Sequence, residues 1–217
     1  MTGAAAGGPQ VRARRPGRPE ARRIAGVDFM APSVEVARRL IGVELRLDGV
    51  GGRIVEVEAY DREDPASHTY RGPTPRNAAM LGPPGHAYVY RSYGLHWCLN
   101  FVCREPGHGA GVLIRALEPL SGLDAMRRRR GVIADRLLCA GPGRLTEALG
   151  VDASHDGVAL DTPPFELRPA GSAKLDVVCG PRIGISKAVD VPWRFGLRGS
   201  RYLSRPFAAR PAADAST

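Results

Sequence analysis

The sequence feature that most constrains the fold is the segment GHAYVYRSYGLHWCLNF, residues 85–101. It holds five of the thirteen aromatic residues of the chain, and a glycine directly follows its third tyrosine. Aromatic and β-branched residues on both sides of a glycine-containing turn are typical of two paired strands. The segment therefore predicts a β-hairpin, with strands over residues 87–91 and 95–102 and a turn over residues 91–94.

The predicted hairpin arranges its tyrosines in two ways. Because successive side chains of a strand point to opposite faces, Tyr88 and Tyr90 line one side of the sheet together. Tyr93 stands at the tip beside Gly94, where its own hairpin cannot bury the ring. An aromatic ring on a protruding tip of a basic protein suits insertion between stacked bases. The alternative is that the ring folds back onto the protein surface.

The charge of the chain favours polyanionic partners. Its 217 residues include 31 basic and 22 acidic side chains, which gives a formal net charge of +9. Basic side chains that neutralise phosphates release counterions, so nucleic acid is the main candidate partner. Lys174 and Lys187 are the only lysines, and the other basic residues are arginines.

The composition divides the chain into one domain and two tails. Residues 1–25 combine Ala, Gly and Pro with arginines and predict a flexible tail, either a solvated extension or a basic arm that adds nonspecific DNA affinity. Residues 207–217 predict a second flexible tail, which leaves residues 26–206 as one domain. No apolar run approaches the length of a membrane span, and the N-terminus has no hydrophobic signal core. We therefore expect an intracellular protein without a membrane partner.

Periodicity within the domain predicts a mixed α+β fold built on a largely antiparallel sheet. Besides the aromatic hairpin, alternating residues around Asp48-Gly49 predict a second hairpin. The helices are expected over residues 31–42, 74–81, 120–130 and 139–150. The further strands are expected over residues 43–47, 52–60 and 111–119, and the C-terminal third is strand-like and rich in loops.

The strand over residues 52–60 carries acidic side chains on one face. Alternation places Glu56, Glu58 and Tyr60 on one side and apolar residues on the other. One interpretation is a half-exposed strand with solvated acids. The other is a functional site at the end of a rigid strand. The long polar loop that follows, residues 61–77, favours the second interpretation, because a simple connection needs far fewer residues.

Several separated motifs resemble one known family. They are VEVEAY, SHTYRGPTPRN, GPPGHAYVYRSYGLHWCLN, GAGVLIRALEP, CAGPGRLTEALG, PRIGIS and PWRF, and the likeness covers about residues 28–205. Together they resemble the bacterial form of the alkyladenine (3-methyladenine) DNA glycosylase family. The resemblance implies a single compact domain, with a curved and largely antiparallel sheet, surrounding helices and a protruding hairpin. It also implies base-excision repair, in which a damaged purine is flipped out of duplex DNA and its N-glycosidic bond is hydrolysed.

The resemblance implies roles for three residues in DNA distortion and catalysis. Glu58 looks like the general base that activates water, and Arg115 like the group that helps to hold this water. Tyr93 looks like the wedge that enters the minor groove of double-stranded DNA and takes the place of the flipped nucleotide.

The resemblance also implies which residues bind the damaged base. Tyr60 would stack on one face of the base, with His68 and Tyr90 on the other. Asn100 would obstruct the 2-amino group of a normal guanine, and Tyr88 would support the pocket from beside it. Electron-rich rings suit a cationic alkylated purine, because cation–π attraction contributes about 1 kcal/mol or more to a desolvated cation.

The expected enzyme is monofunctional and has no cofactor. A lyase needs an amine that forms a Schiff base with the sugar, and neither Lys174 nor Lys187 falls within the pocket motifs. The four cysteines form no Cys-x-x-Cys pair and the histidines show no metal-ligand spacing, so we expect no metal and no organic cofactor. We further expect a monomer in the cytoplasm, associated with the nucleoid.

Two other functions stay open at this stage. The first is a non-catalytic basic module that binds nucleic acid, in which Glu58 is structural. The second is a metal-dependent nuclease, which needs clustered carboxylates. Asp61, Glu63 and Asp64 stand in one loop, without a clear partner group elsewhere.

Overall fold

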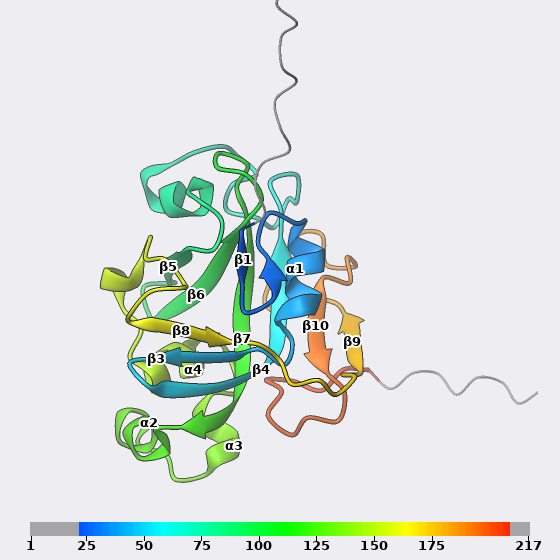
Figure 1. Ribbon diagram of the computed structural model, residues 1–217. Coiled ribbons are helices and arrows are strands. Elements are labelled where there is room, and N and C mark those ends of the chain that lie inside the picture. Colours follow the sequence, from blue (N-terminus) through cyan, green and yellow to red (C-terminus); the bar gives the residue numbers. More distant parts are fainter. Residues whose placement is uncertain (1–21, 209–217) are drawn as a thin grey trace, which may run out of the picture.

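The computed structural model describes residues 22–208 of the chain (Figure 1). The two predicted tails fall largely on residues 1–21 and 209–217, which lie outside the described residues. At the start of the described part, β1 (Arg23–Ile24) pairs with β2 (Val27–Asp28) in a small antiparallel sheet. Ile24 belongs to the hydrophobic core.

The main sheet is organised around two long antiparallel strands, β4 and β7 (Figure 1). The β5–β6 hairpin extends the sheet beyond β7, and β10 and β9 extend it beyond β4. All strand pairs of this sheet in the described residues are antiparallel. Its strands are β3 (Glu44–Leu47), β4 (Val50–Tyr60), β5 (Ala87–Ser92), β6 (His96–Cys103), β7 (Ala110–Ser121), β8 (Phe165–Arg168), β9 (Val177–Gly180) and β10 (Arg194–Leu197).

Strand β4 changes partners along its length, and this change curls the sheet. Its first residues pair with β3, which also pairs with β8, whereas residues 56–58 pair with β10. The pairing of β4 with β7 also contains register shifts, after Gly51, after Ile54 and after Glu56. Bulges of this kind bend a strand and increase its twist. The sheet is therefore a curled half-barrel (Figure 1).

The helices cover the ends and the apolar side of the sheet. Helix α1 packs against β4 and β7, while α4 packs against β6 and β7 and is covered by α2 and α3. The helices are α1 (Ser33–Leu40), η1 (Pro75–Leu81), α2 (Leu123–Arg130), α3 (Asp135–Leu138), α4 (Pro142–Leu149) and η2 (Ala153–His155). In the described part of the chain, none of them has both the length and the apolar character of a membrane span.

The predicted α+β fold with a largely antiparallel sheet is confirmed, and the differences lie at the ends of elements. The aromatic hairpin forms with strand ends within one residue of the prediction. The helix expected from residue 120 begins only at Leu123, because β7 continues to Ser121. Between them Gly122 has φ of 71°, a conformation that glycine adopts without strain. The helix expected over residues 74–81 is a 3₁₀ helix.

The curled sheet has one apolar face and one face with polar and aromatic side chains. On β4, Val57 and Ala59 belong to the hydrophobic core, whereas Glu56 and Glu58 point to the other face. Both glutamates are 0% exposed. The interpretation of these residues as solvated acids is therefore wrong, and each carboxylate needs partners inside the protein.

Candidate active site

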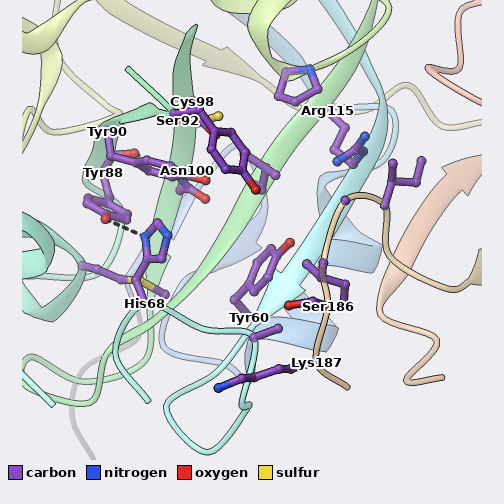
Figure 2. Close-up of a pocket in the computed structure, with 18 of the residues that line it drawn as sticks. Tyr60, His68, Tyr88, Tyr90, Ser92, Cys98, Asn100, Arg115, Ser186 and Lys187 are labelled. Carbon is purple, nitrogen blue, oxygen red and sulfur yellow. Dashed lines mark hydrogen bonds between the residues drawn. The ribbon is translucent and has the colours of Figure 1, made fainter. Parts of the chain in front are cut away.

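A cavity of about 650 Å³ opens on the polar face of the sheet (Figure 2). It lies between the β5–β6 hairpin, the end of β4 and the loop that joins β9 to β10. Seven of the eight residues predicted for the site line it: Tyr60, His68, Tyr88, Tyr90, Tyr93, Asn100 and Arg115. The eighth, Glu58, lies directly behind the lining, in contact with Tyr60 and Arg115.

One wall of the cavity consists of three aromatic rings. Tyr88 and Tyr90 are stacked, with 5.4 Å between ring centroids and 26° between ring planes. The His68 ring stands edge-on to Tyr90, at 4.5 Å between centroids. His68 Nδ1 is also 2.9 Å from Tyr88 Oη, within hydrogen-bond distance (Figure 2). The strand pattern brings the two tyrosines to one face, and this hydrogen bond attaches the loop histidine to them.

The groups of this wall are neutral near pH 7. Desolvation lowers the pKa of His68, and the nearby Arg76 guanidinium lowers it further. Burial raises the pKa of Tyr88 and of Tyr90 well above the usual range of a phenol. The three rings therefore carry no positive charge themselves, although the Arg76 guanidinium, which also lines the cavity, lies 5.6 Å from the centre of the Tyr90 ring.

Tyr60, the last residue of β4, forms the opposite wall (Figure 2). The Arg182 guanidinium lies 4.7 Å from the centre of the Tyr60 ring. Arg182 is itself buried, donates to the carbonyl oxygen of Ala59 at 3.0 Å and forms an ion pair with Asp64. Burial and then the nearby Glu58 carboxylate raise the pKa of Tyr60, so its hydroxyl keeps its proton and can donate. A supported ring thus faces the wall of Tyr88, Tyr90 and His68.

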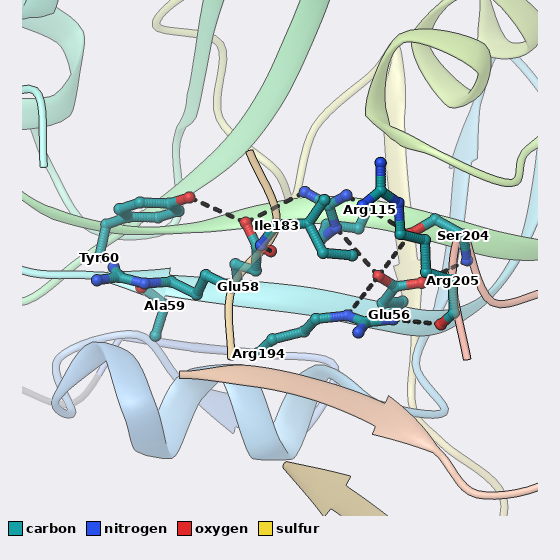
Figure 3. A network of polar contacts seen from close by, with 10 residues as sticks. Glu56, Glu58, Ala59, Tyr60, Arg115, Ile183, Arg194, Ser204 and Arg205 are labelled. Carbon is teal, nitrogen blue, oxygen red and sulfur yellow. Dashed lines mark hydrogen bonds and ion pairs between the residues drawn. The ribbon is translucent and has the colours of Figure 1, made fainter. Parts of the chain in front are cut away.

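Glu58 is surrounded by hydrogen-bond donors (Figure 3). Its Oε2 accepts from Tyr60 Oη at 2.9 Å and from Arg115 Nη1 at 3.2 Å. Its Oε1 accepts from the backbone N–H of Ile183 at 2.7 Å. Three donors offset the free energy that burial of a carboxylate costs. The cavity therefore has a carboxylate at its inner end, held by two of the side chains that line it.

Arg115 reaches this carboxylate from a bulge in β7. In the pairing of β4 with β7, one residue of β7 is left over between the partners of Glu56 and Val57, and that residue is Arg115. A bulge redirects a side chain relative to a regular strand. Burial by itself lowers the pKa of Arg115, but the carboxylates of Glu58 and Glu56 outweigh this effect and raise it. Arg115 is therefore a permanent cation between two carboxylates.

Tyr93 occupies the tip of the hairpin in an unusual backbone conformation. Its side chain is 91% exposed, so the ring does not fold back onto the surface. Tyr93 has φ of 50° and Gly94 has φ of 69°, and Leu95 N–H donates to the Ser92 carbonyl across the turn. A left-handed conformation is strained for a bulky residue such as tyrosine, and such strain is often found at functional sites.

Asn100 lies on β6 directly opposite Tyr88, at the inner part of the cavity. It is 6% exposed, and its Nδ2 donates to the Tyr88 carbonyl oxygen at 3.1 Å. This hydrogen bond fixes the orientation of the side-chain amide. Asn100 therefore presents a rigid edge to anything that enters the cavity.

The loop between β9 and β10 was not assigned a role from the sequence. Residues 183–187 line the cavity, and Arg182 supports the Tyr60 wall. The motif PRIGIS is visible in the sequence, but its apolar residues carry no chemical signature. Lys187, which directly follows this motif, lies in the lining (Figure 2). Lys187 lies outside the motifs in the sequence, and only the structure brings it to the cavity.

The acidic residues of the 61–77 loop do not gather as a nuclease would require. Asp61 accepts from His108 Nε2 at 2.9 Å, and Asp64 pairs with Arg182. Within residues 22–208, no three His, Cys, Asp or Glu side chains come together as metal ligands would.

The geometry describes a site for a planar ring. Two opposed aromatic walls bind such a ring by stacking, and a buried carboxylate at the inner end can take up a proton from a nearby molecule. Aromatic faces also attract a cation that is stacked on them. The cavity can thus hold a planar aromatic group beside a buried carboxylate.

Comparison with known proteins identifies the class of enzyme. A family model described as methylpurine-DNA glycosylase matches residues 27–201. A protein of Nitrosospira multiformis, described as "Putative 3-methyladenine DNA glycosylase", is 67% identical over 181 residues, which cover 83% of this chain and 93% of its own length. Proteins with the same description from Nitrobacter winogradskyi and Agrobacterium fabrum are 61% and 54% identical over 180 residues, covering 82% of this chain and 86% and 91% of their own lengths.

The chain belongs to the methylpurine-DNA glycosylase family. It is a DNA glycosylase, a hydrolase of N-glycosidic bonds, and DNA is its partner in repair. The resemblance seen in the sequence motifs is confirmed.

Proposed function

We propose that this enzyme flips alkylated purines, 3-methyladenine among them, out of duplex DNA and hydrolyses their N-glycosidic bond. The observation that carries the proposal is the Glu58 carboxylate at the inner end of an aromatic cavity. The description of the relatives as 3-methyladenine DNA glycosylases supports the choice of lesion. Deaminated purines such as hypoxanthine are a second class of substrate that the planar slot can hold.

The cavity suits an alkylated purine for a physical reason. Alkylation at a ring nitrogen makes the purine cationic, and a cation between aromatic faces gains about 1 kcal/mol or more when it is desolvated. Tyr60 on one side, and His68 with Tyr90 on the other, supply these faces in the proposed complex. Because His68 is neutral near pH 7, it does not repel the charged base.

In the proposed reaction, Glu58 acts as the general base. A water molecule gives a proton to the Glu58 carboxylate while its oxygen bonds to C1′ of the deoxyribose. The bond between C1′ and the purine nitrogen breaks, and its electron pair leaves with the base, which neutralises the positive charge of the alkylated ring. The negative charge of Glu58 also stabilises the positive charge that develops on the sugar. Arg115 orients the carboxylate and the water.

Two further residues adapt the site to duplex DNA. Extruding a base costs a few kcal/mol, and a damaged base that pairs or stacks poorly costs less. Tyr93, which is 91% exposed on the hairpin tip, would enter the minor groove and fill the gap that the base leaves. Asn100 would clash with the 2-amino group of a normal guanine and so limit the activity to other purines.

The principal test is the substitution Glu58→Gln. General base catalysis contributes about 10²- to 10⁴-fold, so base release from duplex DNA methylated with dimethyl sulfate should fall by that factor. Binding to a duplex with an abasic-site analogue should stay within about threefold of the wild type, a free-energy difference of less than 1 kcal/mol. Glu147→Gln is the matched control, because Glu147 is an exposed carboxylate of α4 outside the cavity.

Two outcomes of this experiment contradict the proposal. A Glu58→Gln enzyme that releases base at the wild-type rate rules out Glu58 as the base. If the wild type binds methylated DNA but releases no base, the non-catalytic binding module is correct. A panel of duplexes with single lesions (3-methyladenine, 7-methylguanine, hypoxanthine and ethenoadenine) then defines the substrates by the abasic sites formed.

We also infer that the enzyme is monofunctional, acts as a monomer and works on the nucleoid in the cytoplasm. Hydrolysis through Glu58 leaves an intact strand with an abasic site and needs no amine. Lys187 is the one amine found among the cavity-lining residues, so it is the group to test. Borohydride should trap no covalent adduct between the wild type and DNA. An adduct that Lys187→Gln abolishes would show instead that the enzyme is a lyase.

A further inference from the structure

A second buried carboxylate, Glu56, lies next to the proposed catalytic pair and has no part in the reaction described above. It precedes Glu58 by two residues on the same face of β4 and is 0% exposed. Glu56 Oε1 accepts from Arg115 Nε at 3.0 Å and from Arg194 Nε at 2.8 Å (Figure 3). Ser204 donates to both of its oxygens, through its Oγ at 2.7 Å and its backbone N–H at 2.5 Å.

The contact with Glu56 determines how Arg115 is oriented. The guanidinium group is planar, and its N–H groups point in fixed directions within that plane. When Glu56 holds the Nε edge, Nη1 is left to donate to Glu58 Oε2 at 3.2 Å. A rotation of the guanidinium away from Glu56 would break the contact with Glu58 at the same time. The two carboxylates are thus coupled through one rigid cation.

The C-terminal segment, residues 202–207, completes this arrangement. Ser204 contacts Glu56, and its Oγ also lies 3.5 Å from Arg115 Nη2. Arg194 joins the segment to β10, because its Nη2 donates to the carbonyl oxygen of Arg205 and its guanidinium lies 4.0 Å from the centre of the Phe207 ring. A segment about 150 residues away in the sequence therefore borders the catalytic groups.

We propose that Glu56, anchored by the C-terminal segment through Ser204, is a positioning residue that sets the geometry of the general base. This inference rests on the proposed role of Glu58. Glu56 acts through Arg115 and does not touch the substrate.

Two substitutions of Glu56 test how it holds Arg115. Glu56→Gln keeps the shape but accepts through a neutral amide oxygen, so its hydrogen bond to Arg115 weakens and kcat should fall by about tenfold. Glu56→Asp keeps the charge but is one methylene shorter, so kcat should fall by about 10- to 100-fold. In both variants KM and the affinity for an abasic-analogue duplex should stay as in the wild type. Base release from methylated duplex DNA is measured over a range of substrate concentrations, after subtraction of spontaneous loss.

Two further variants keep the test decisive if Glu56→Gln does not fold. Ser204→Ala retains every charge and should lower kcat about tenfold without a change in KM, because only the anchor of Glu56 is weakened. Val57→Ala is the control for stability, since Val57 lies on the same strand but faces the core. It should lower the melting temperature and leave kcat and KM of the folded enzyme unchanged.

The outcomes distinguish this inference from the proposed function. If Glu56→Gln and Glu56→Asp lower kcat only in proportion to the unfolded fraction, Glu56 is merely structural and the inference is wrong. Unchanged kcat in both Ser204→Ala and Glu56→Asp would also overturn it. If Glu58→Gln itself retains activity, the proposed function fails, whatever the Glu56 variants show.

Discussion

The exposed tyrosine at the hairpin tip gives a prediction that separates stability from activity. Removing the ring should lower base release, whereas relieving the backbone strain should raise the free energy of unfolding. Tyr93 makes little contact with the folded protein, because 91% of its surface is exposed. It also has φ of 50°, which costs a residue other than glycine roughly 1–2 kcal/mol. The proposed wedge is therefore held in a strained conformation that folding alone does not need. We compare Tyr93→Ala with Tyr93→Gly, since both remove the ring and only glycine removes the strain.

The magnitudes follow from exposure and backbone conformation. Tyr93→Ala should change the free energy of unfolding by no more than about 0.5 kcal/mol, as for other exposed positions. Glycine relieves the strain but loses about 0.5–1 kcal/mol more in chain entropy, so Tyr93→Gly should exceed Tyr93→Ala in stability by up to about 1 kcal/mol. Stacking of one aromatic ring against bases contributes about 1–3 kcal/mol. Loss of this stacking should lower kcat/KM in both variants by about 5- to 150-fold.

The assays are urea unfolding and base release from methylated duplex DNA under single-turnover conditions. Ile133→Ala is the matched control, because Ile133 is 86% exposed and apolar but does not line the cavity. It should leave base release unchanged. Wild-type release by Tyr93→Ala would refute the role of the ring as a wedge. A glycine variant that is less stable than the alanine variant would refute the argument from backbone strain.

Three further predictions concern the cavity walls. Asn100→Gly removes a side chain that lines the cavity and is proposed to exclude guanine, so release of normal guanine should rise by about tenfold or more, measured as abasic sites in unmethylated DNA. The pKa of His68 is lowered in the folded protein, so the unfolded chain binds the proton more readily. The free energy of unfolding should therefore fall as pH decreases below about 6.5. In urea unfolding of His68→Gln, this free energy should depend less on pH between about pH 7 and 5 than it does in the wild type. Asp64→Asn leaves the buried Arg182 without its counter-charge and should lower the free energy of unfolding by about 3 kcal/mol, measured by urea titration, whereas Asp190→Asn at an exposed position should not.

Features that depend on neighbouring residues in the chain were predicted well from the sequence. Alternation around Tyr93-Gly94 predicted the hairpin, the shared face of Tyr88 and Tyr90 and the exposed tip, because side-chain direction in a strand has a period of two. The same rule placed Glu56 and Glu58 on one face of β4. The alternation predicts which face of the strand a side chain occupies, but it does not predict which segments of the chain pack over that face.

The groups that cover the polar face of β4 come from distant parts of the chain, and they determine the surroundings of Glu56 and Glu58. The Ile183 N–H that holds Glu58 lies 125 positions away in the sequence, and the Ser204 donors to Glu56 lie 148 positions away. The bulge that directs Arg115 toward Glu58 arises from a register shift between β4 and β7, and the sequence of either strand alone does not reveal it.

The sequence by itself determined the hairpin, the strand faces and, through its motifs, the family. Only the tertiary structure decided that both glutamates are buried, that the loop with Lys187 lines the cavity and that the C-terminal segment reaches Glu56 and Arg115. The physical reason is that local side-chain direction follows from backbone geometry, whereas a buried charge is stable only where distant segments bring donors to it.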